Sequence, residues 1–518
     1  MESLKFIEDV DVSKGVKSFD ELSKILFFRR KEKLKVVLCH GVFDLLHVGH
    51  IRYLKRSKKF GDLLVVTVTP DEYVNKGPNR PAFSENLRVE AISALEFVDY
   101  VAINKWPMAV ETIKNLQPDF YVKGKDYSDE KGDKTGGILL ERETIESING
   151  KFVIVEEMTF SSSSLMNKYL PLCPPKMNKF LKEFSKKYSY KEIEAYIENL
   201  ASLKVLLVGE AVIDDCQYCR TMGKSGDDPV LCVSYERNEM FIGGGLAIAN
   251  HVAEFCKESA LVTFLGSEKS YDSFIKERLN PKIQAHFLEM SKGTSTIVKR
   301  RFVEEGSFQK LFEVYTIDED EENPNDSEKL CKKLEKLVPN YDVVIVADYG
   351  HAMMNTDAIS LLEKRAKFLA VYTQINSGNQ LFNTMLKYSK ADFICISEDE
   401  IRIDTRRKKG SIKSIIEEVS TKLEGAKIVV TRGEEGIVCY DPKSGFSYIP
   451  DLVGKKVSRD DSGGAVLALA SLCVKKNIPM DVVGLVANFV GIQGMRVVGN
   501  RMVRDKISLL RSLEHSLK

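Results

Sequence analysis

Two histidines with a fixed spacing are the residues of this chain best suited to chemistry. His47 and His50 belong to the sequence HVGH, which follows an apolar predicted strand at residues 36–39 and a turn with Gly41 and Asp44. Backbone N–H groups at a helix start are unpaired and bind phosphate. Imidazoles can add hydrogen bonds to charge that grows on a phosphoryl group in a transition state. The pattern therefore predicts a phosphate-binding helix entry.

Zinc binding and ordinary capping are the alternatives for this pair. No Cys, Asp or Glu lies at ligand spacing around it, which argues against zinc. The preceding strand and turn argue against histidines that only cap a helix. The CxxC sequence from Cys216 to Cys219 has no second pair and no nearby histidine, so we expect no metal site there.

The elements around the histidines alternate between strands and helices. The predicted strands are 36–39, 63–69, 100–103, 119–122 and 152–155, and the predicted helices are 85–97, 110–116, 141–148 and 164–170. Another helix, capped by Ser18 with Leu22, Ile25 and Leu26 on one face, is predicted within a leader at residues 1–30. Together they predict one α/β domain with a parallel sheet.

A proline-rich break, PLCPP at residues 171–175, precedes a predicted helical connector at 177–200 and a second α/β domain. The strands of that domain are predicted at 204–208, 341–347, 368–372, 392–396 and 427–431. The acidic run 318–326 is predicted to be a solvated loop. The predicted parts are a leader at 1–30, a first domain at 31–170, a linker and connecting helix at 171–202 and a second domain at 203–518.

The composition is that of a soluble globular protein of two or three domains. Among 518 residues, 43% are apolar and 29% charged, and 76 basic against 75 acidic residues give a net charge of +1. This balance argues against a nucleic-acid or membrane-surface partner. No apolar run approaches a membrane span, and the first residues lack a signal-peptide core. We expect a cytoplasmic protein whose ten cysteines are reduced.

Residues 20–170 resemble the nucleotidyltransferase superfamily with the HxGH motif. Heptose-phosphate adenylyltransferases are the most similar group, with glycerol-phosphate cytidylyltransferases behind them. The sequences that carry the resemblance are CHGVFDLLHVGH at 39–50, KFGD at 59–62, NRP at 79–81, LEFVDYV at 95–101, DFYVKGKDY at 119–127 and SSSS at 161–164. The resemblance implies a Rossmann-like domain that transfers a nucleotidyl group from a nucleoside triphosphate to a sugar phosphate and releases pyrophosphate.

The resemblance also implies roles for individual residues. The implied catalytic residues are His47, His50, Lys59 and Arg88. The implied nucleotide-binding residues are Val42, Phe43, Gly49, Lys123, Gly124, Ser162, Ser163 and Ser164. Asp44 would bind the acceptor or orient the loop, and Mg²⁺ would arrive with the triphosphate.

Residues 203–512 resemble the ribokinase-like sugar kinases, in particular the heptose-phosphate kinase. GEAVID at 209–214, GGG at 243–245, DYG at 348–350, SE at 397–398 and TRGEEG at 431–436 carry this resemblance. The implied ligand-site residues are Asp214, Gly244, Gly245, Asp348, Glu398, Thr431, Gly433, Asp461, Gly463 and Gly464. Residues 217–239 are similar to the small β-lid through which such kinases dimerise, so we expect a homodimer.

The sequence departs from the kinase pattern at three functional positions. The family carries a GAGD segment whose aspartate takes the proton of the sugar hydroxyl, and ungapped alignment of the next helix places Gly464 there. Asp460 or Asp461 is the possible replacement. Leu246 and Cys395 stand where the family has asparagines. These departures predict a degenerate kinase domain.

The main hypothesis is a nucleotidyltransferase that uses ATP or CTP and a heptose-1-phosphate-like sugar phosphate to make an NDP-sugar for surface polysaccharide. One alternative is a truly bifunctional sugar-phosphate kinase and nucleotidyltransferase, like the bifunctional heptose enzymes with the domain order reversed. In the other, the second domain is a non-catalytic sugar- or nucleotide-binding or dimerisation module. The base and the acceptor stay open.

Overall fold

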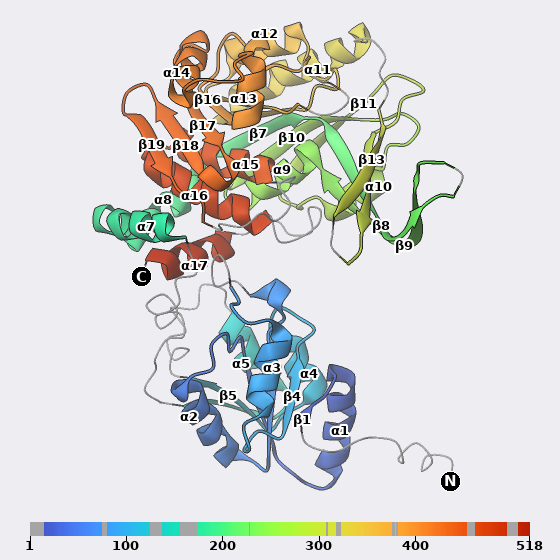
Figure 1. Ribbon diagram of the computed structural model, residues 1–518, viewed down its shortest axis with the longest axis vertical. Coiled ribbons are helices and arrows are strands. Elements are labelled where there is room, and N and C mark those ends of the chain that lie inside the picture. Colours follow the sequence, from blue (N-terminus) through green and yellow to red (C-terminus); the bar gives the residue numbers. More distant parts are fainter. Residues whose placement is uncertain are drawn as a thin grey trace. The chain divides into compact units, whose positions relative to one another are not determined.

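The computed structural model describes residues 15–74, 80–124, 137–155, 174–226, 228–306, 309–317, 323–375, 379, 382–452, 462–494 and 506–517. Apart from the last five residues, the chain divides into two compact units, residues 1–172 and 173–513 (Figure 1). Among the described residues, no helix is both long and apolar enough to cross a membrane.

The first unit is built on a parallel sheet of six strands in the order β1-β4-β3-β2-β5-β6. The strands are β1 (Gly15–Val16), β2 (Val36–Gly41), β3 (Leu63–Val68), β4 (Tyr100–Ile103), β5 (Phe120–Gly124) and β6 (Lys151–Val155). The helices are α1 (Phe19–Lys31), α2 (Val48–Ser57), α3 (Glu85–Ser93), α4 (Val110–Leu116) and α5 (Gly137–Ser147). This confirms the predicted α/β fold.

Helices cover both faces of this sheet because its central strands are apolar on both sides. α1, α4 and α5 pack on one face, where Leu22, Ile113 and Ile145 share a core with the strands. α2 and α3 pack on the other through Leu54 and Ile92. The helix predicted after Ser18 is confirmed as α1, but it lies in the core of the unit rather than in a separate leader.

The strand order reverses between β2 and β5, which neighbour each other in the sheet. From β2 the chain builds outward through β3 and β4, and it then returns to add β5 and β6 on the other side. In open α/β sheets, ligands bind outside the carboxyl ends of the strands at such a switch point. β2 ends at Gly41 and β5 at Gly124, so the switch point adjoins the HVGH sequence.

The second unit contains a sheet of nine strands in the order β11-β10-β7-β14-β15-β16-β17-β18-β19. Its strands are β7 (Lys204–Gly209), β10 (Glu258–Leu265), β11 (Ile283–Glu289), β14 (Val343–Asp348), β15 (Leu369–Thr373), β16 (Phe393–Ser397), β17 (Lys427–Thr431), β18 (Ile437–Asp441) and β19 (Gly445–Ile449). The strands from β11 to β17 are parallel, and β18 and β19 add an antiparallel edge. All five strands predicted here are confirmed within two residues.

Helices lie on both faces of the large sheet (Figure 1). One face carries α7 (Pro175–Lys187), α8 (Tyr190–Asn199), α9 (Gly244–Ala253), α15 (Ser462–Lys475), α16 (Met480–Gly494) and α17 (Lys506–Leu517). The other carries α11 (Pro324–Leu337), α12 (Thr356–Arg365), α13 (Glu398–Asp404) and α14 (Ile412–Lys422), and α10 (Asp272–Arg278) packs near the sheet edge. The predicted connector is two helices, α7 and α8, whose Met177 and Ile193 belong to this core.

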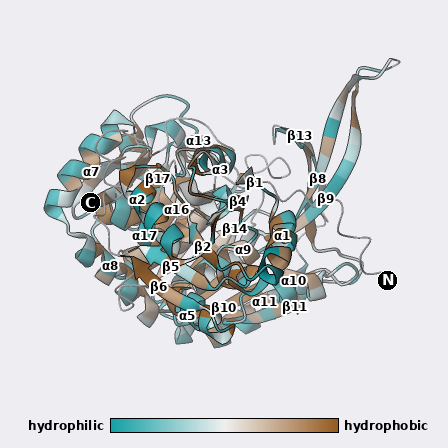
Figure 2. Ribbon diagram, turned by 90° about the horizontal axis from the view of Figure 1, so that it is seen from below, coloured by the Kyte–Doolittle hydropathy of each residue, from teal (hydrophilic) through white to brown (hydrophobic). Residues whose placement is uncertain are grey.

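A smaller sheet of four strands, in the order β13-β12-β8-β9, accompanies the large one. Its strands are β8 (Ala211–Lys224), β9 (Leu231–Gly243), β12 (Ile297–Glu304) and β13 (Lys310–Thr316). The predicted β-lid at 217–239 lies in its β8–β9 hairpin, which projects as a long ribbon (Figure 2).

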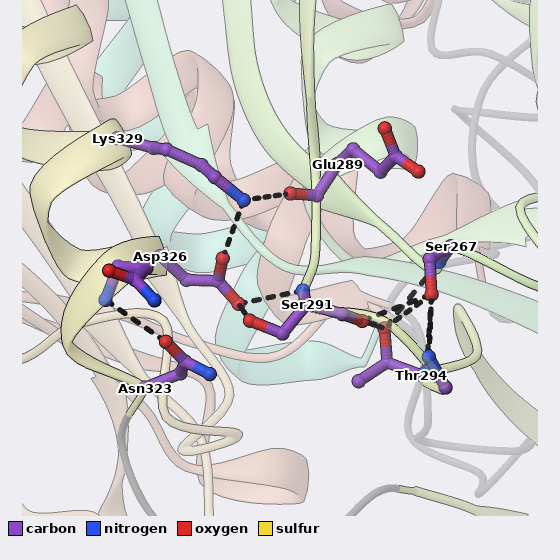
Figure 3. Close-up of polar contacts among 9 residues, drawn as sticks. Ser267, Glu289, Ser291, Thr294, Asn323, Asp326 and Lys329 are labelled. Atoms are coloured by element: carbon purple, nitrogen blue, oxygen red, sulfur yellow. Dashed lines mark hydrogen bonds and ion pairs between the residues drawn. The ribbon is translucent and has the colours of Figure 1, made fainter.

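The acidic run predicted as a solvated loop lies partly in a helix, which corrects that prediction. Residues 318–322 are outside the described residues, but Asp326 lies in the first turn of α11. One of its carboxylate oxygens accepts hydrogen bonds from the backbone N and the Oγ of Ser291, at 2.9 and 2.8 Å, and the other pairs with Lys329 (Figure 3). Asp326 therefore fastens the β11–β12 connection to α11.

Removing the cap of α1 tests whether this helix is part of the first unit. Ser18 and Glu21 form a capping box, so Ser18→Ala should cost about 1 kcal/mol and speed local hydrogen exchange in residues 19–31 about fivefold. Ser189→Ala is the matched control, because Ser189 and Glu192 form the same box on α8 in the second unit. Mass spectrometry of the intact chain should show each change confined to its own helix. Unchanged exchange in α1 would contradict its place in the core.

Candidate functional site

The two histidines of HVGH lie together at the amino end of α2. His47 is the N-cap residue, and its Nδ1 accepts a hydrogen bond of 3.1 Å from the backbone N–H of Gly49. The rings of His47 and His50 stack with their centroids 4.1 Å apart and their planes 25° apart. The structure therefore pairs two imidazoles at a helix start, where backbone donors favour an anion.

The turn before the histidines is held in an uncommon conformation. Phe43 has a φ of +50°, in the left-handed region that bulky residues rarely adopt. Its ring is buried and meets the His50 ring edge-on at 5.3 Å. Because strained backbone persists only where its surroundings enforce it, this turn is a feature of the site.

Arg88, expected to neutralise the triphosphate, is buried beneath this turn. Its guanidinium donates to the carbonyl oxygens of Val42, Thr69 and Phe83 and pairs with Asp71. These contacts tie the β2–α2 turn to the β3–α3 connection at the carboxyl edge of the sheet. Arg88 therefore holds the turn in position through its hydrogen bond to the carbonyl oxygen of Val42.

Asp44, expected to bind the acceptor or orient the loop, is also buried. Its Oδ2 pairs with Arg80 Nη1 at 2.8 Å, and its Oδ1 accepts from the backbone N of Ala82 at 2.6 Å. Both oxygens are engaged by the segment after β3, which agrees with the loop-orienting alternative. Arg80 lies in the NRP sequence, but its pairing with Asp44 is not visible in the sequence.

Other expected site residues are more scattered. Gly124 ends β5 at the switch point. Lys59 lies exposed in the short turn that follows α2. α2 has ten residues and is about 15 Å long at 1.5 Å per residue, and Lys59 lies beyond its far end from His47. The structure therefore does not bring Lys59 to the histidines. Ser162, Ser163 and Ser164 lie outside the described residues.

Lys123 lies at the end of β5 in a buried polar cluster. Its Nζ is 3.1 Å from Glu141 Oε2 and 3.5 Å from the carbonyl oxygen of His40. Tyr121 donates to Glu141 Oε2 at 2.9 Å. The His40 ring contacts the hydroxyls of two threonines, Thr67 and Thr69, and its pKa is lowered to about 4 by burial and by the Lys123 charge. Sequence reasoning gave no role to His40, Tyr121 or Glu141.

In the second unit, four of the expected ligand-site residues line one cavity of about 440 Å³. They are Glu398, Thr431, Gly433 and Gly463. Glu398 pairs with Arg432 at 2.7 Å and with Arg402 at 2.7 Å. Burial alone would raise the pKa of Glu398, but the two guanidiniums hold it below its usual value.

The remaining residues of that set lie elsewhere. Asp348 lines a different cavity of about 580 Å³ and pairs with Lys387 at 2.7 Å. Asp214 lies on β8 and pairs with Arg301 at 3.0 Å. Gly244 and Gly245 are the first residues of α9, and the Gly245 N–H donates to the carbonyl oxygen of Glu210. Asp461 is outside the described residues.

The departures from the kinase pattern have structural counterparts. A Cβ atom added to Gly464 would lie 2.8 Å from Ile248 Cγ1, so the space for a longer side chain at this position is occupied. Leu246 is fully buried in α9. Cys395 is buried on β16, and burial raises the pKa of its thiol above the usual range. Apolar packing thus takes the place of polar groups at these positions.

The part of the chain that the structure describes contains no group of three or more His, Cys, Asp or Glu side chains arranged to hold a metal ion.

Two families match the chain. Residues 38–168 match the cytidylyltransferase-like family, and residues 203–464 match the pfkB family of carbohydrate kinases. The bifunctional protein HldE of Syntrophotalea carbinolica is 35% identical over 139 residues, which are 26% of this chain and 27% of that protein. HldE of Campylobacter concisus is 42% identical over 140 residues, 26% of this chain and 29% of that protein. Each match thus spans less than a third of the relative.

The fold of the second unit also has solved counterparts. Phosphofructokinase-2 from Escherichia coli, in complex with potassium, matches with a TM-score of 0.50 and 11% identity over 61% of this chain and 100% of that chain. Both domain types expected from the sequence are thus present, and a two-domain chain of the HldE kind agrees better with these similarities than a transferase alone. The chain belongs to the pfkB carbohydrate kinase family and carries a cytidylyltransferase-like domain ahead of its kinase domain.

Proposed function

We propose that the first unit transfers a nucleotidyl group from a nucleoside triphosphate to a sugar phosphate. The observation that carries this proposal is the stacked pair of His47 and His50 at the amino end of α2, beside the switch point of the sheet. The amino end of α2 offers helix N–H groups and two imidazoles, and the Lys123 ammonium lies near the carboxyl end of β5 at the switch point. This combination suits a phosphorus centre that gains negative charge.

The reaction is a single displacement at the α-phosphorus. An oxygen of the sugar phosphate attacks, a new P–O bond forms, and the bond to the β-phosphate oxygen breaks so that pyrophosphate leaves. His47 and His50 donate hydrogen bonds to the α- and β-phosphates as charge grows there. Catalysis is positioning plus electrostatic stabilisation, without a covalent intermediate on the protein.

Mg²⁺ fits this site as a partner of the triphosphate. The carboxylate of the turn, Asp44, is already engaged by Arg80 and Ala82, so the ion would be held by phosphate oxygens. It would neutralise triphosphate charge when bound.

Replacing either histidine tests this proposal. His47→Asn keeps an N-cap residue and His50→Asn keeps a polar side chain, and each should lower kcat about 100-fold or more because an electrostatic donor is lost. The measurement is pyrophosphate release with four nucleoside triphosphates against a panel of sugar phosphates. Lys55→Met is the control on the exposed face of α2 and should leave the rate within twofold. Wild-type rates in both histidine variants would contradict the site.

The second candidate function is phosphorylation of a sugar or sugar phosphate by the second unit. The cavity that collects Glu398, Thr431 and Gly433 supports it, because the family resemblance places the nucleotide there. Gly464 stands where the family has its base, so a carboxylate at 460 or 461 would have to take the hydroxyl proton. Kinase action would supply the phosphorylated acceptor for the first unit.

A variant that lacks transferase activity allows the kinase activity to be measured by itself. The full chain with His47→Asn should release ADP from ATP only when a sugar acceptor is present, and Glu398→Gln should lower that rate about tenfold because it alters the nucleotide cavity. Nucleotide binding by calorimetry without ADP release would instead support the non-catalytic module. Neither binding nor turnover would leave the second unit as a scaffold.

We further propose that the product is an NDP-sugar for surface polysaccharide and that the protein acts in the cytoplasm as a homodimer. The apolar side chains on the β8–β9 ribbon support dimerisation, since Met222 is 67% and Tyr235 59% exposed. The product assignment rests on the resemblance to heptose-phosphate enzymes, and the panel of sugar phosphates tests it.

A further inference from the structure

We infer that Glu141 is a positioning residue of the proposed transferase site, which it serves by holding the Lys123 ammonium at the switch point between β2 and β5. This inference rests on the proposed function of the first unit. It assigns a role in phosphate binding to a side chain that lies on α5, behind the sheet, far in sequence from the HVGH motif.

Lys123 lies at the switch point between β2 and β5. It is the next-to-last residue of β5, and its Nζ is 3.5 Å from the carbonyl oxygen of His40, the next-to-last residue of β2. The side chain is only 7% exposed, so solvent screens its charge weakly. Side chains alternate along a strand, so Lys123 shares the face of Tyr121, the face that α5 covers.

Glu141 is held in place by its own partners. Its Oε2 lies 3.1 Å from Lys123 Nζ and accepts from the Tyr121 hydroxyl at 2.9 Å, while its Oε1 accepts from the backbone N of Ala109 at 3.1 Å. Burial alone would raise the pKa of Glu141, but the Lys123 charge and these hydrogen bonds lower it. Glu141 is therefore a fixed counter-ion, and its carboxylate fixes the direction of the ammonium.

Stability alone is a poor explanation for this pair. A buried ion pair is expensive to desolvate, and apolar residues of similar volume often stabilise a fold as well or better. Buried titratable groups with shifted pKa values are candidates for functional sites. His40 stays uncharged at neutral pH, so Lys123 is the cation of this cluster.

Removing the Glu141 charge should act through Lys123. Without its counter-ion, a buried ammonium either loses its proton or turns away, because burial disfavours the charged form. In both cases the positive charge leaves the switch point. Glu141→Gln should therefore resemble Lys123→Met, although Glu141 itself does not touch the substrate.

The test combines the two variants with ligand binding and kinetics on the full chain. Inorganic pyrophosphate binding by calorimetry should weaken about tenfold in Glu141→Gln and in Lys123→Met, and the double variant should be no weaker than Lys123→Met. The KM for the magnesium–nucleoside triphosphate should rise about tenfold with a smaller change in kcat. If the losses of pyrophosphate-binding free energy in the two single variants add in the double variant, the inference is overturned.

Asp99→Asn is the matched control. Asp99 is a buried carboxylate that pairs with Lys58 and accepts from the backbone N of Leu64, but it precedes β4 and so lies at the amino edge of the same sheet. It should lower the melting temperature and leave pyrophosphate binding unchanged. If Glu141→Gln behaves in the same way, Glu141 is structural and the inference fails. If pyrophosphate binding depends on Glu141 but the wild-type chain turns over no substrate, the proposed function fails and Glu141 keeps only its role in phosphate binding through Lys123.

Discussion

The arrangement of the first site depends on one buried guanidinium. Arg88 cannot lose its charge, so a fold that buries it must supply acceptors for its donors. The acceptors come from the turn at Val42, from the end of β3 at Thr69 and Asp71, and from Phe83. The left-handed Phe43 follows directly after one of these acceptors. Arg88 therefore fixes the turn that precedes the histidines, and it does so without having to contact phosphate.

The two units treat their charged side chains differently. In the first unit, Asp44 and Arg80 form a buried ion pair, and the stacked imidazoles of His47 and His50 lie at the amino end of α2. In the second, the acidic side chains expected to meet sugar or nucleotide are themselves paired, as Glu398 is with Arg432. A ligand that uses Glu398 must therefore compete with a guanidinium at 2.7 Å.

Local patterns in the sequence predict the parts of this structure that depend on neighbours along the chain. Strands buried on both faces read as apolar runs, so most strand positions are confirmed, and the HVGH spacing predicts paired imidazoles because a helix start brings them together. The capping box at Ser18 predicts the start of α1, but no local pattern shows that this helix packs into the core.

Partners that are distant in sequence could not be predicted in this way. Lys59 matches a family sequence, yet α2 carries it away from the histidines. Glu141 meets Lys123 only because α5 covers the face of β5 on which that lysine lies. The roles of Ser162, Ser163, Ser164 and Asp461 stay predictions, since these residues lie outside the described part of the chain.

The closeness of the Ile248 side chain to Gly464 couples these two positions. A side chain at 464 would have its first carbon 2.8 Å from Ile248 Cγ1 on another helix, so an aspartate introduced there requires the Ile248 side chain to shift. Placing a carboxylate at 464 therefore calls for a smaller side chain at 248 as well, and the effects of changing the two positions should not add.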